Sequence, residues 1–585
     1  MTTVKKTYLF YPIFLFWMLT NIACHKPTGE TEKPNPAKEN SLHFRIQGIQ
    51  DISEAENNNE QHKASTNSAS TRRKVAAESD IVNLDGIDAI MTISENIPNE
   101  YPDKLEKKSR TVKNARLNAG SNGNIARAIS QLKNGVQYKI VLYKADQNGK
   151  PIEFVDQADG QVGGKDISIE AYRNTKYRWY AYTYNNCSPL EVFTSNQNSL
   201  PVKPSGNNNL LRQDFAYATG LITTGNVIDG SSSINNIVLT RKTAQIIVEI
   251  NSRGMFGAIA YASPRFKDNS GLSKADFRLV DSSFQNPTKT INSFNVYNHH
   301  GSGYSVPVGT DSVTVADWKR RYTFYTVANG STPVNLVVSL DTLRISSERI
   351  SEFDGRSYFV ERNFFSRDFS FPNFIPQAGK SYFISIKLVE SAIPIGSTQW
   401  ARANVYRNAK GPLLPGNFWE YRFRYDNPLY ISTSVVPPMT DMFTNDIYNI
   451  GGKNICERIY PEGVWDLPTR EDFNELDRYS NKEIIREPGN WYLRFIPQNS
   501  VPLSIGYVDG YLNLVPIGYK RISTEGFSQY FPTSMRFRET KGYWRTTDPA
   551  VFARVNFSTN PNDYINTGTY TASWNACIRC IRKKN

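Results

Sequence analysis

Residues 136–156 read VQYKIVLYKADQNGKPIEFVD, and this stretch sets the fold class. Residues 136–143 are rich in β-branched and aromatic side chains, and residues 152–155 repeat that composition after a polar turn. The turn contains Asn148-Gly149, a pair that supplies the positive φ angles required by tight hairpins. The stretch therefore predicts two antiparallel strands joined by a short turn.

The same alternation of short strands and polar turns recurs on both sides of this hairpin. Aromatic residues make up 12% of the chain and long amphipathic helical patterns are scarce, so we predict a mainly β protein built from β-sandwiches. The further predicted strands occupy residues 42–49, 87–94, 166–172, 177–185, 214–220, 233–252 (two strands joined across Arg241-Lys242), 321–330, 334–341 and 381–389.

One helix is predicted, starting at Thr469 within WDLPTREDFNELDRY (465–479). Thr469 is suited to cap it, and Asp472 stands at the third helical position, where a carboxylate completes a capping box. Phe473, Leu476 and Tyr479 share one apolar face. Three of the four carboxylates in this stretch lie at the exposed start of the helix, where its dipole favours acids, so a solvated helix face is expected. The four are Asp466, Glu471, Asp472 and Glu475.

The first residues carry the marks of an export signal. Lys5 and Lys6 precede an almost wholly apolar run at 8–19, which is shorter than the roughly 20 residues that a membrane helix needs. Ala23 stands directly before Cys24, so this segment resembles a bacterial lipobox in which the Cys24 thiol is acylated. The alternative is plain secretion with an incidental cysteine.

These patterns divide the chain into five predicted segments. They are a lipoprotein signal peptide at 1–23, a flexible polar tether at 24–41, β-sandwich domains at 42–205 and 206–393, and a mixed α+β module at 394–585.

Several classes of function lack the residues that they need. The formal net charge of +13 is spread along the chain, which argues against nucleic acid as a partner. No histidine follows His300, so the last module has no His-dependent base, triad or metal site. The CIRC motif at 577–580 lies in a predicted terminal strand, and a zinc site would need two further ligands. We therefore predict no enzyme activity, no catalytic or metal site and no cofactor.

Four segments of the chain carry a resemblance to a known family. They are VQYKIVLYKADQNG (136–149), YRWYAYTYNN (177–186), DFAYATG (214–220) and IVLTRKTAQIIVEI (237–250). In order and spacing over about residues 40–393 they resemble the fimbrillins of Bacteroidetes. The resemblance implies a lipoprotein precursor of a pilus subunit, with two consecutive fimbrillin-like β-sandwich domains, located at the outer membrane and in the fimbrium.

The last module resembles C-terminal modules related to the C-type lectin and sulfatase-modifying-factor folds. The resemblance is carried by PEGVWDLPTREDF (461–473), GYWRTTD (542–548) and CIRCIRKK (577–584). Four cysteines follow Cys24, and their number alone leaves three pairings open. The resemblance implies a disulfide between Cys456 and Cys580. Cys577 would then stay free or pair with a distant cysteine, and Cys187, in another predicted domain, is expected to be unpaired.

Together the two resemblances imply an adhesive minor or tip subunit of a fimbrium. Such a subunit joins other fimbrial subunits by strand complementation, after a surface protease cuts behind an arginine and frees the strand at 42–49. The candidate processing sites in the polar stretches downstream are Arg72, Arg73, Arg110 and Arg116. The closed last module offers no spare strand to donate, which suits a tip.

Two other hypotheses stay open on the sequence. The first is a non-polymerising outer-membrane lipoprotein that binds a glycan or a host protein. The second is an enzyme related to the sulfatase-modifying factors, which the missing histidines and cysteine site disfavour. A calcium-dependent sugar site is also disfavoured, because Glu487-Pro488-Gly489-Asn490 and Trp574-Asn575-Ala576 depart from the lectin motifs Glu-Pro-Asn and Trp-Asn-Asp.

Overall fold

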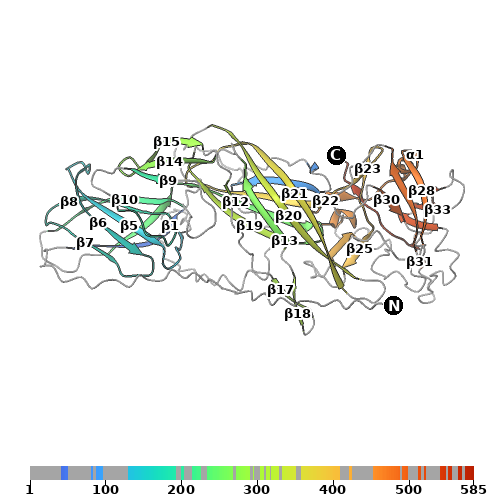
Figure 1. Ribbon diagram of the computed structural model, residues 1–585, viewed down its shortest axis with the longest axis horizontal. Coiled ribbons are helices and arrows are strands. Elements are labelled where there is room, and N and C mark those ends of the chain that lie inside the picture. The colour runs from blue at the N-terminus through green and yellow to red at the C-terminus, as the bar shows by residue number, and fades with distance from the viewer. Residues whose placement is uncertain are drawn as a thin grey trace, which may run out of the picture.

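The computed structural model describes residues 41–50, 81–83, 87–95, 129–192, 199–202, 214–225, 234–267, 272–289, 294–295, 304–308, 311–315, 318–328, 332–350, 357–408, 420–423, 452–487, 490–498, 511–514, 520–521, 541–548, 551–556, 564–569 and 574–584. Strands dominate these residues, beside one α-helix, α1 (Arg470–Arg478), and a 3-10 turn, η6 (Cys456–Arg458), which confirms the mainly β prediction. Figure 1 shows three bodies along the long axis, with the first domain at one end and α1 at the other.

A single curled sheet forms the first domain. Its concave face packs side chains from both ends of the sheet, and the rings of Phe44 and Trp179 meet there edge to face at 6.2 Å. The predicted hairpin at 136–156 is present, and Gly149 in its turn has a φ of +82°. In hydrogen-bonding order the strands are β4 (Ile129–Ser130), β1 (Ser41–Gln50), β11 (Asn235–Arg241), β10 (Ala216–Thr223), β8 (Lys176–Thr183), β5 (Gln137–Ala145) and β6 (Pro151–Gln161), with β7 (Ile167–Glu170) also paired to β1.

Two facing sheets form the second domain, and its core lies between them. Alternate residues of β12 (Ala244–Gly254) point into this core, and Ala244, Ile246, Val248 and Ile250 are all fully buried. One sheet has the order β19 (Lys319–Thr326), β12 (Ala244–Gly254), β22 (Ser381–Glu390), β3 (Ile87–Ser94) and β2 (Ile81–Asn83). The facing sheet has the order β16 (Phe294–Asn295), β13 (Ala258–Phe266), β20 (Val334–Ile350) and β21 (Ser357–Phe374).

Two smaller sheets flank these domains. A three-stranded sheet packs an aromatic cluster against the outer face of the first domain, where Phe277 lies 4.8 Å from Phe215 and 5.0 Å from Tyr217 between ring centroids. Its strands are β15 (Ser283–Lys289), β14 (Ser273–Arg278) and β9 (Ser199–Val202). The other is the hairpin of β17 (Tyr304–Val308) and β18 (Asp311–Val315).

The third domain combines α1 with several short sheets around three buried tryptophans, Trp400, Trp465 and Trp544. It adjoins the second domain through an apolar cluster in which Phe256 and Phe423 meet at 5.6 Å. Its sheets are β23 (Ile393–Ile395), β24 (Thr398–Trp400), β36 (Ile581–Arg582) and β27 (Trp465–Asp466); β25 (Val405–Asn408) and β26 (Glu420–Phe423); β28 (Ser480–Glu487), β29 (Asn490–Pro497) and β30 (Leu512–Leu514); β31 (Lys520–Arg521) and β35 (Trp574–Asn575); and β32 (Lys541–Arg545), β33 (Val551–Asn556) and β34 (Ile565–Thr569).

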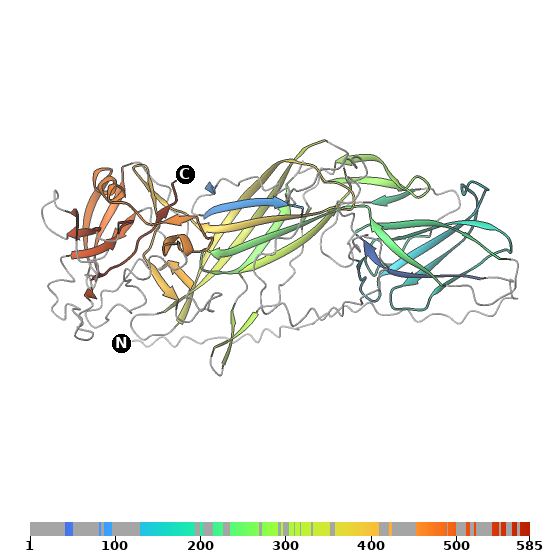
Figure 2. The same ribbon diagram turned by 180° about the vertical axis from the view of Figure 1, so that it is seen from behind.

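Each of the first two domains contains strands from both sides of the predicted boundary at 205/206, so this boundary does not separate their sheets. β10 and β11 lie after that boundary yet belong to the first sheet, and β3 lies before it yet pairs with β22 of the second domain. Figure 2 shows the bright blue strand β3 beside the yellow and green strands of the second domain. The polar stretch at 195–212 connects two strands, but the composition of a connection does not determine which sheet the next strand joins. The domain boundary was therefore predicted at the wrong place.

The predicted helix is confirmed, including its cap. Thr469 accepts a hydrogen bond from the Asp472 backbone N–H while the Asp472 carboxylate accepts one from the Thr469 backbone N–H. Phe473 and Leu476 are fully buried beneath it. The expectation of a solvated face was wrong for Asp472, whose exposed fraction is 1%. Thr398 and Lys584 of the third domain cover this residue and bond to its carboxylate.

Candidate functional site

The first candidate site is the place of β1 in the first sheet. Side chains of this strand alternate between the core and solvent, as a sheet with one buried face requires. Leu42, Phe44 and Ile46 point inward and are buried, whereas Arg45 and Gln47 are exposed. The strand is therefore an integral part of the first core.

β1 lies between neighbours on both of its edges. On one side it pairs in parallel with β11, from Phe44 opposite Asn235 to Gln50 opposite Thr240. On the other side it pairs antiparallel with β7 at one end and with β4 at the other. All of these neighbours begin at Ile129 or later in the chain. Within the described residues, the walls around β1 thus come from the downstream part of the protein.

Polar contacts also hold β1 in register. The Asn235 side-chain amide donates to the His43 carbonyl oxygen at 3.0 Å. At the solvent-facing rim, Arg45 donates to both carboxylate oxygens of Asp166, at 2.7 and 2.8 Å. The Asp166 pKa is lowered by this hydrogen bond to Arg45. These contacts fix the position of the strand, while the buried apolar side chains dominate its stability.

A bulge interrupts the parallel pairing between Ile46 and Gly48. A Cβ atom at Gly48 would lie 2.6 Å from Ile129 Cγ2 and 2.7 Å from the Ser130 carbonyl oxygen. Both distances are shorter than any normal contact, and the second is to backbone. Only glycine fits at this position while β4 keeps its place.

The second candidate site is the C-terminal segment, which is built into the third domain. β36 pairs with β24 on one side and with β27 on the other. The backbone N–H of Lys583 donates to the Val464 carbonyl oxygen at 3.0 Å, and Lys584 Nζ lies 2.6 Å from Asp472 Oδ1. A disulfide joins Cys456 to Cys580, 124 residues apart. Cross-linking a loop of this length stabilises the fold by about 4–5 kcal/mol in the chain-entropy model.

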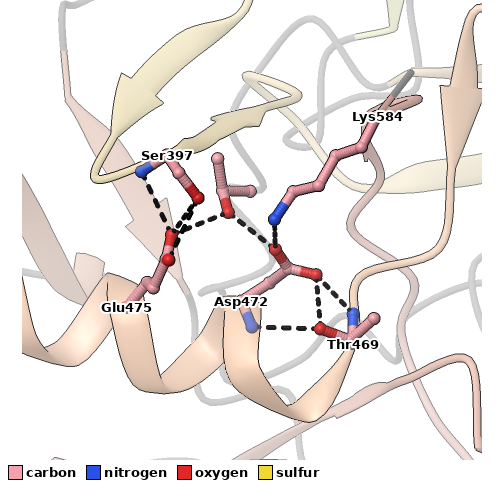
Figure 3. A network of polar contacts seen from close by, with 6 residues as sticks. Ser397, Thr469, Asp472, Glu475 and Lys584 are labelled. Carbon is pink, nitrogen blue, oxygen red and sulfur yellow. Dashed lines mark hydrogen bonds and ion pairs between the residues drawn. The ribbon is translucent and has the colours of Figure 1, made fainter.

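Figure 3 shows how α1 receives this segment. Asp472 accepts from Thr398 at 2.6 Å as well as from Lys584, and Glu475 accepts from the Ser397 backbone and hydroxyl. Burial alone would raise the pKa of Asp472, but the hydrogen bonds from Lys584, Thr398 and Thr469 outweigh it and lower that pKa. The Asp472 carboxylate is therefore held in its ionised form. It connects α1 to the hairpin of β23 and β24 and to the C-terminal segment.

A buried ion pair connects this segment to the second domain. Arg582 Nη2 donates to Asp88 Oδ2 and to the Glu390 carbonyl oxygen, both at 2.5 Å, and its guanidinium lies 3.8 Å from the Trp465 ring centroid. The side chains of Arg582 and Asp88 are 6% and 4% exposed. Burial raises the pKa of Asp88, with Arg582 opposing it, and burial lowers the pKa of Arg582. Strand β3 is thereby tied to both the second and the third domain.

The residues predicted as lipidation and processing sites lie outside the described residues: Cys24, Arg72, Arg73, Arg110 and Arg116. Cys577 is buried and takes no part in the disulfide of Cys456 and Cys580. Cys187 is disulfide-bonded, so the expectation that it is unpaired was wrong.

Other predictions concern metals and membranes. Within the part of the chain that the structure describes, no group of three or more His, Cys, Asp or Glu side chains is placed to hold a metal ion. Over the same residues no helix has the length and hydropathy to cross a bilayer. Sequence reasoning missed Gly48, Asp88 and Arg582, because each acts through a contact with a residue far away in the chain.

Comparisons with known proteins give structural neighbours only. No protein-family model matches the sequence, and no curated protein matches it. A candidate cell adhesion protein from Bacteroides ovatus aligns with 10% identity over 45% of this chain and 85% of its own, at a TM-score of 0.28. A fimbrial assembly protein from Parabacteroides distasonis aligns with 9% identity over 43% of this chain and 82% of its own, at a TM-score of 0.21. A fimbrial anchor protein from Porphyromonas gingivalis aligns with 13% identity over 42% of this chain and 93% of its own, at a TM-score of 0.19.

Proposed function

We propose that this chain is an adhesive minor or tip subunit of a surface fimbrium, and that its first domain accepts a strand from another subunit in place of β1. Exchange of one strand for another preserves the sheet, since main-chain hydrogen bonds supply much of the affinity and alternate side chains supply the specificity. The chain acts in this account as an assembly and binding protein without enzymatic activity.

The position of β1 carries the proposal. All its hydrogen-bonded neighbours begin at Ile129 or later, and the candidate processing arginines lie between β1 and that point. A cut at any of them leaves the complete groove in the downstream fragment and leaves β1 attached by non-covalent contacts alone. An uncut chain cannot exchange the strand without competing against its own tethered copy.

The C-terminal segment supports an end position in the polymer. β36 is occupied on both edges, and Arg582, Lys583 and Lys584 are each bonded to groups of the second or third domain. A strand fixed in this way cannot leave to fill a groove elsewhere without opening the third domain. Figure 1 places the first domain and α1 at opposite ends of the molecule, so the third domain would project outward as the adhesive part.

The lipid anchor belongs to the same proposal. Acylation of the Cys24 thiol, which would keep that sulfur out of any disulfide, would hold the precursor at the outer membrane, and a cut downstream would release the folded body from that anchor. The third domain, related by resemblance to lectin-like modules, would then contact a glycan or a protein on a host or bacterial surface.

The contacts of β3 favour processing at Arg72 or Arg73 over Arg110 or Arg116. Of the strands that the structure describes, a cut at the first pair detaches β1 alone. A cut at the second pair also detaches β2 and β3, and β3 lies against β22 and supplies the buried carboxylate of Asp88. We expect N-terminal sequencing of the protein from assembled fimbriae to begin at residue 73 or 74. A start at Cys24 would instead support a non-polymerising lipoprotein, and a start after Arg110 or Arg116 would contradict the preference for the first pair.

A further inference from the structure

From the groove that β1 fills, we infer the sequence pattern of the strand that replaces it: apolar, any, aromatic, any, apolar, any, glycine, apolar, supplied by a chain other than a second copy of this protein. The inference rests on the proposed function and names the partner's chemistry. Each position follows from a contact that β1 now makes.

The first three fixed positions fill the core at every second residue. Leu42, Phe44 and Ile46 lie opposite buried partners, since Leu42 pairs with Ile169 of β7 and Ile46 pairs with Ile237 of β11. Phe44 has no exposed surface, and its ring meets Trp179 edge to face. A smaller side chain here would leave a cavity beside an indole, so the middle position calls for an aromatic residue.

The fourth fixed position is glycine, for the steric reason given above. The clash at Gly48 is with Ile129 Cγ2 and with the Ser130 carbonyl oxygen, both of which belong to the downstream fragment and remain after β1 departs. The bulge also turns the next residue inward, so that Ile49 is buried opposite Leu239 of β11. A replacement strand must reproduce the glycine and the apolar residue that follows it.

The three remaining positions are permissive. At the first, the Asn235 side chain contacts the backbone carbonyl oxygen of His43, which any residue offers. Arg45 pairs with Asp166 at the rim, but its side chain is 56% exposed, and ion pairs in such surroundings contribute little. Gln47 is exposed as well. Residues at these two positions face solvent and do not select the partner.

The sequence of this chain carries the pattern once. Among its 36 glycines, Gly48 alone has an aromatic residue four positions earlier together with an apolar residue six positions earlier. The segment at 512–519, LNLVPIGY, has Leu514 in the aromatic position and Pro516 in the apolar position that follows it, where a proline would remove a hydrogen bond of the ladder. Apart from β1 itself, these 585 residues offer no matching donor. Because the proposed cut separates β1 from the rest of the chain, the partner is a different subunit.

The test uses the full chain, cut between β1 and β2, and labelled decapeptides based on SLHFRIQGIQ (41–50). Gel filtration measures how much labelled peptide stays bound to the protein. Mass spectrometry of the same sample measures how much of the original β1 has been released. We expect the native peptide to replace β1. The peptide with alanine in place of Phe44 should bind about 100-fold or more weakly, and that with alanine in place of Gly48 about tenfold or more weakly.

The matched control is the peptide with alanine in place of Arg45, for which we expect a loss of no more than about fivefold. Equal binding of the Gly48 and Arg45 variants would overturn the inferred pattern while leaving strand exchange intact.

Failure of every peptide, with β1 retained, would contradict the proposed exchange itself. In that event Gly48→Ala and Arg45→Ala in the uncut chain still test the pattern, since only the former should raise the unfolding equilibrium constant of the first domain, by about tenfold or more. Self-association of the cut chain into polymers would overturn the conclusion that the donor is a different subunit.

Discussion

Replacing Phe44 by alanine is expected to destabilise the first domain by about 3–5 kcal/mol. The side chain has no exposed surface and stands at the centre of the core, against Trp179. The substitution removes apolar contacts and leaves a cavity that the curled sheet can close only in part. Urea unfolding, monitored through hydrogen exchange of the β8 and β11 amides, would measure the change in the free energy of unfolding of the first domain.

The matched control for this prediction is Gln47→Ala in the same strand. Gln47 is exposed, so its replacement should change the stability by no more than about 0.5 kcal/mol. Equal, small effects of the two substitutions would mean that β1 is not part of the first core in solution. The groove described above would then lack its basis.

Replacing Asp88 by alanine is expected to destabilise the junction of the second and third domains by about 3–5 kcal/mol. The substitution leaves the guanidinium of Arg582 buried without its carboxylate, and the Glu390 carbonyl oxygen offers only partial compensation. The change should appear as a lower urea midpoint and as faster hydrogen exchange of the amides at 578–582.

A second acidic residue in the same domain provides the control. Asp341 pairs with Arg265 at 2.6 Å, but the two side chains are 40% and 30% exposed. Asp341→Ala should therefore cost less than about 1 kcal/mol. If Asp88→Ala proved no more costly than this control, β3 would not hold the third domain in place, and the argument for processing at Arg72 or Arg73 would lose its support.

Local patterns in the sequence predicted some elements of this fold at their observed positions, whereas the long strand β21 (Ser357–Phe374) was not predicted. The residues of β3 and the capping box of α1 were predicted where the structure has them, because alternation and helix capping depend on neighbours in the chain. The prediction of a mainly β chain followed from the same signals. These are short-range properties that a single sequence contains.

The assembly of those elements could not be predicted in the same way. Nothing in the residues of β3 says that it pairs with β22 rather than with the hairpin at 136–156. Asp472 was placed in solvent because its surroundings, Thr398 and Lys584, lie 74 and 112 residues away. The need for glycine at Gly48 is equally invisible without β4 beside it. Each of these depends on long-range packing, which leaves no periodic trace in the sequence.

Photo-crosslinking from β11 tests the central claim most directly. A photoreactive residue in place of Val238, which lies opposite Gly48, reports which strand occupies the groove in fimbriae assembled on the cell. The account predicts a crosslink to an extended segment of a different subunit, with the inferred glycine in it. A crosslink to residues 41–50 of the same chain in assembled fimbriae would contradict it.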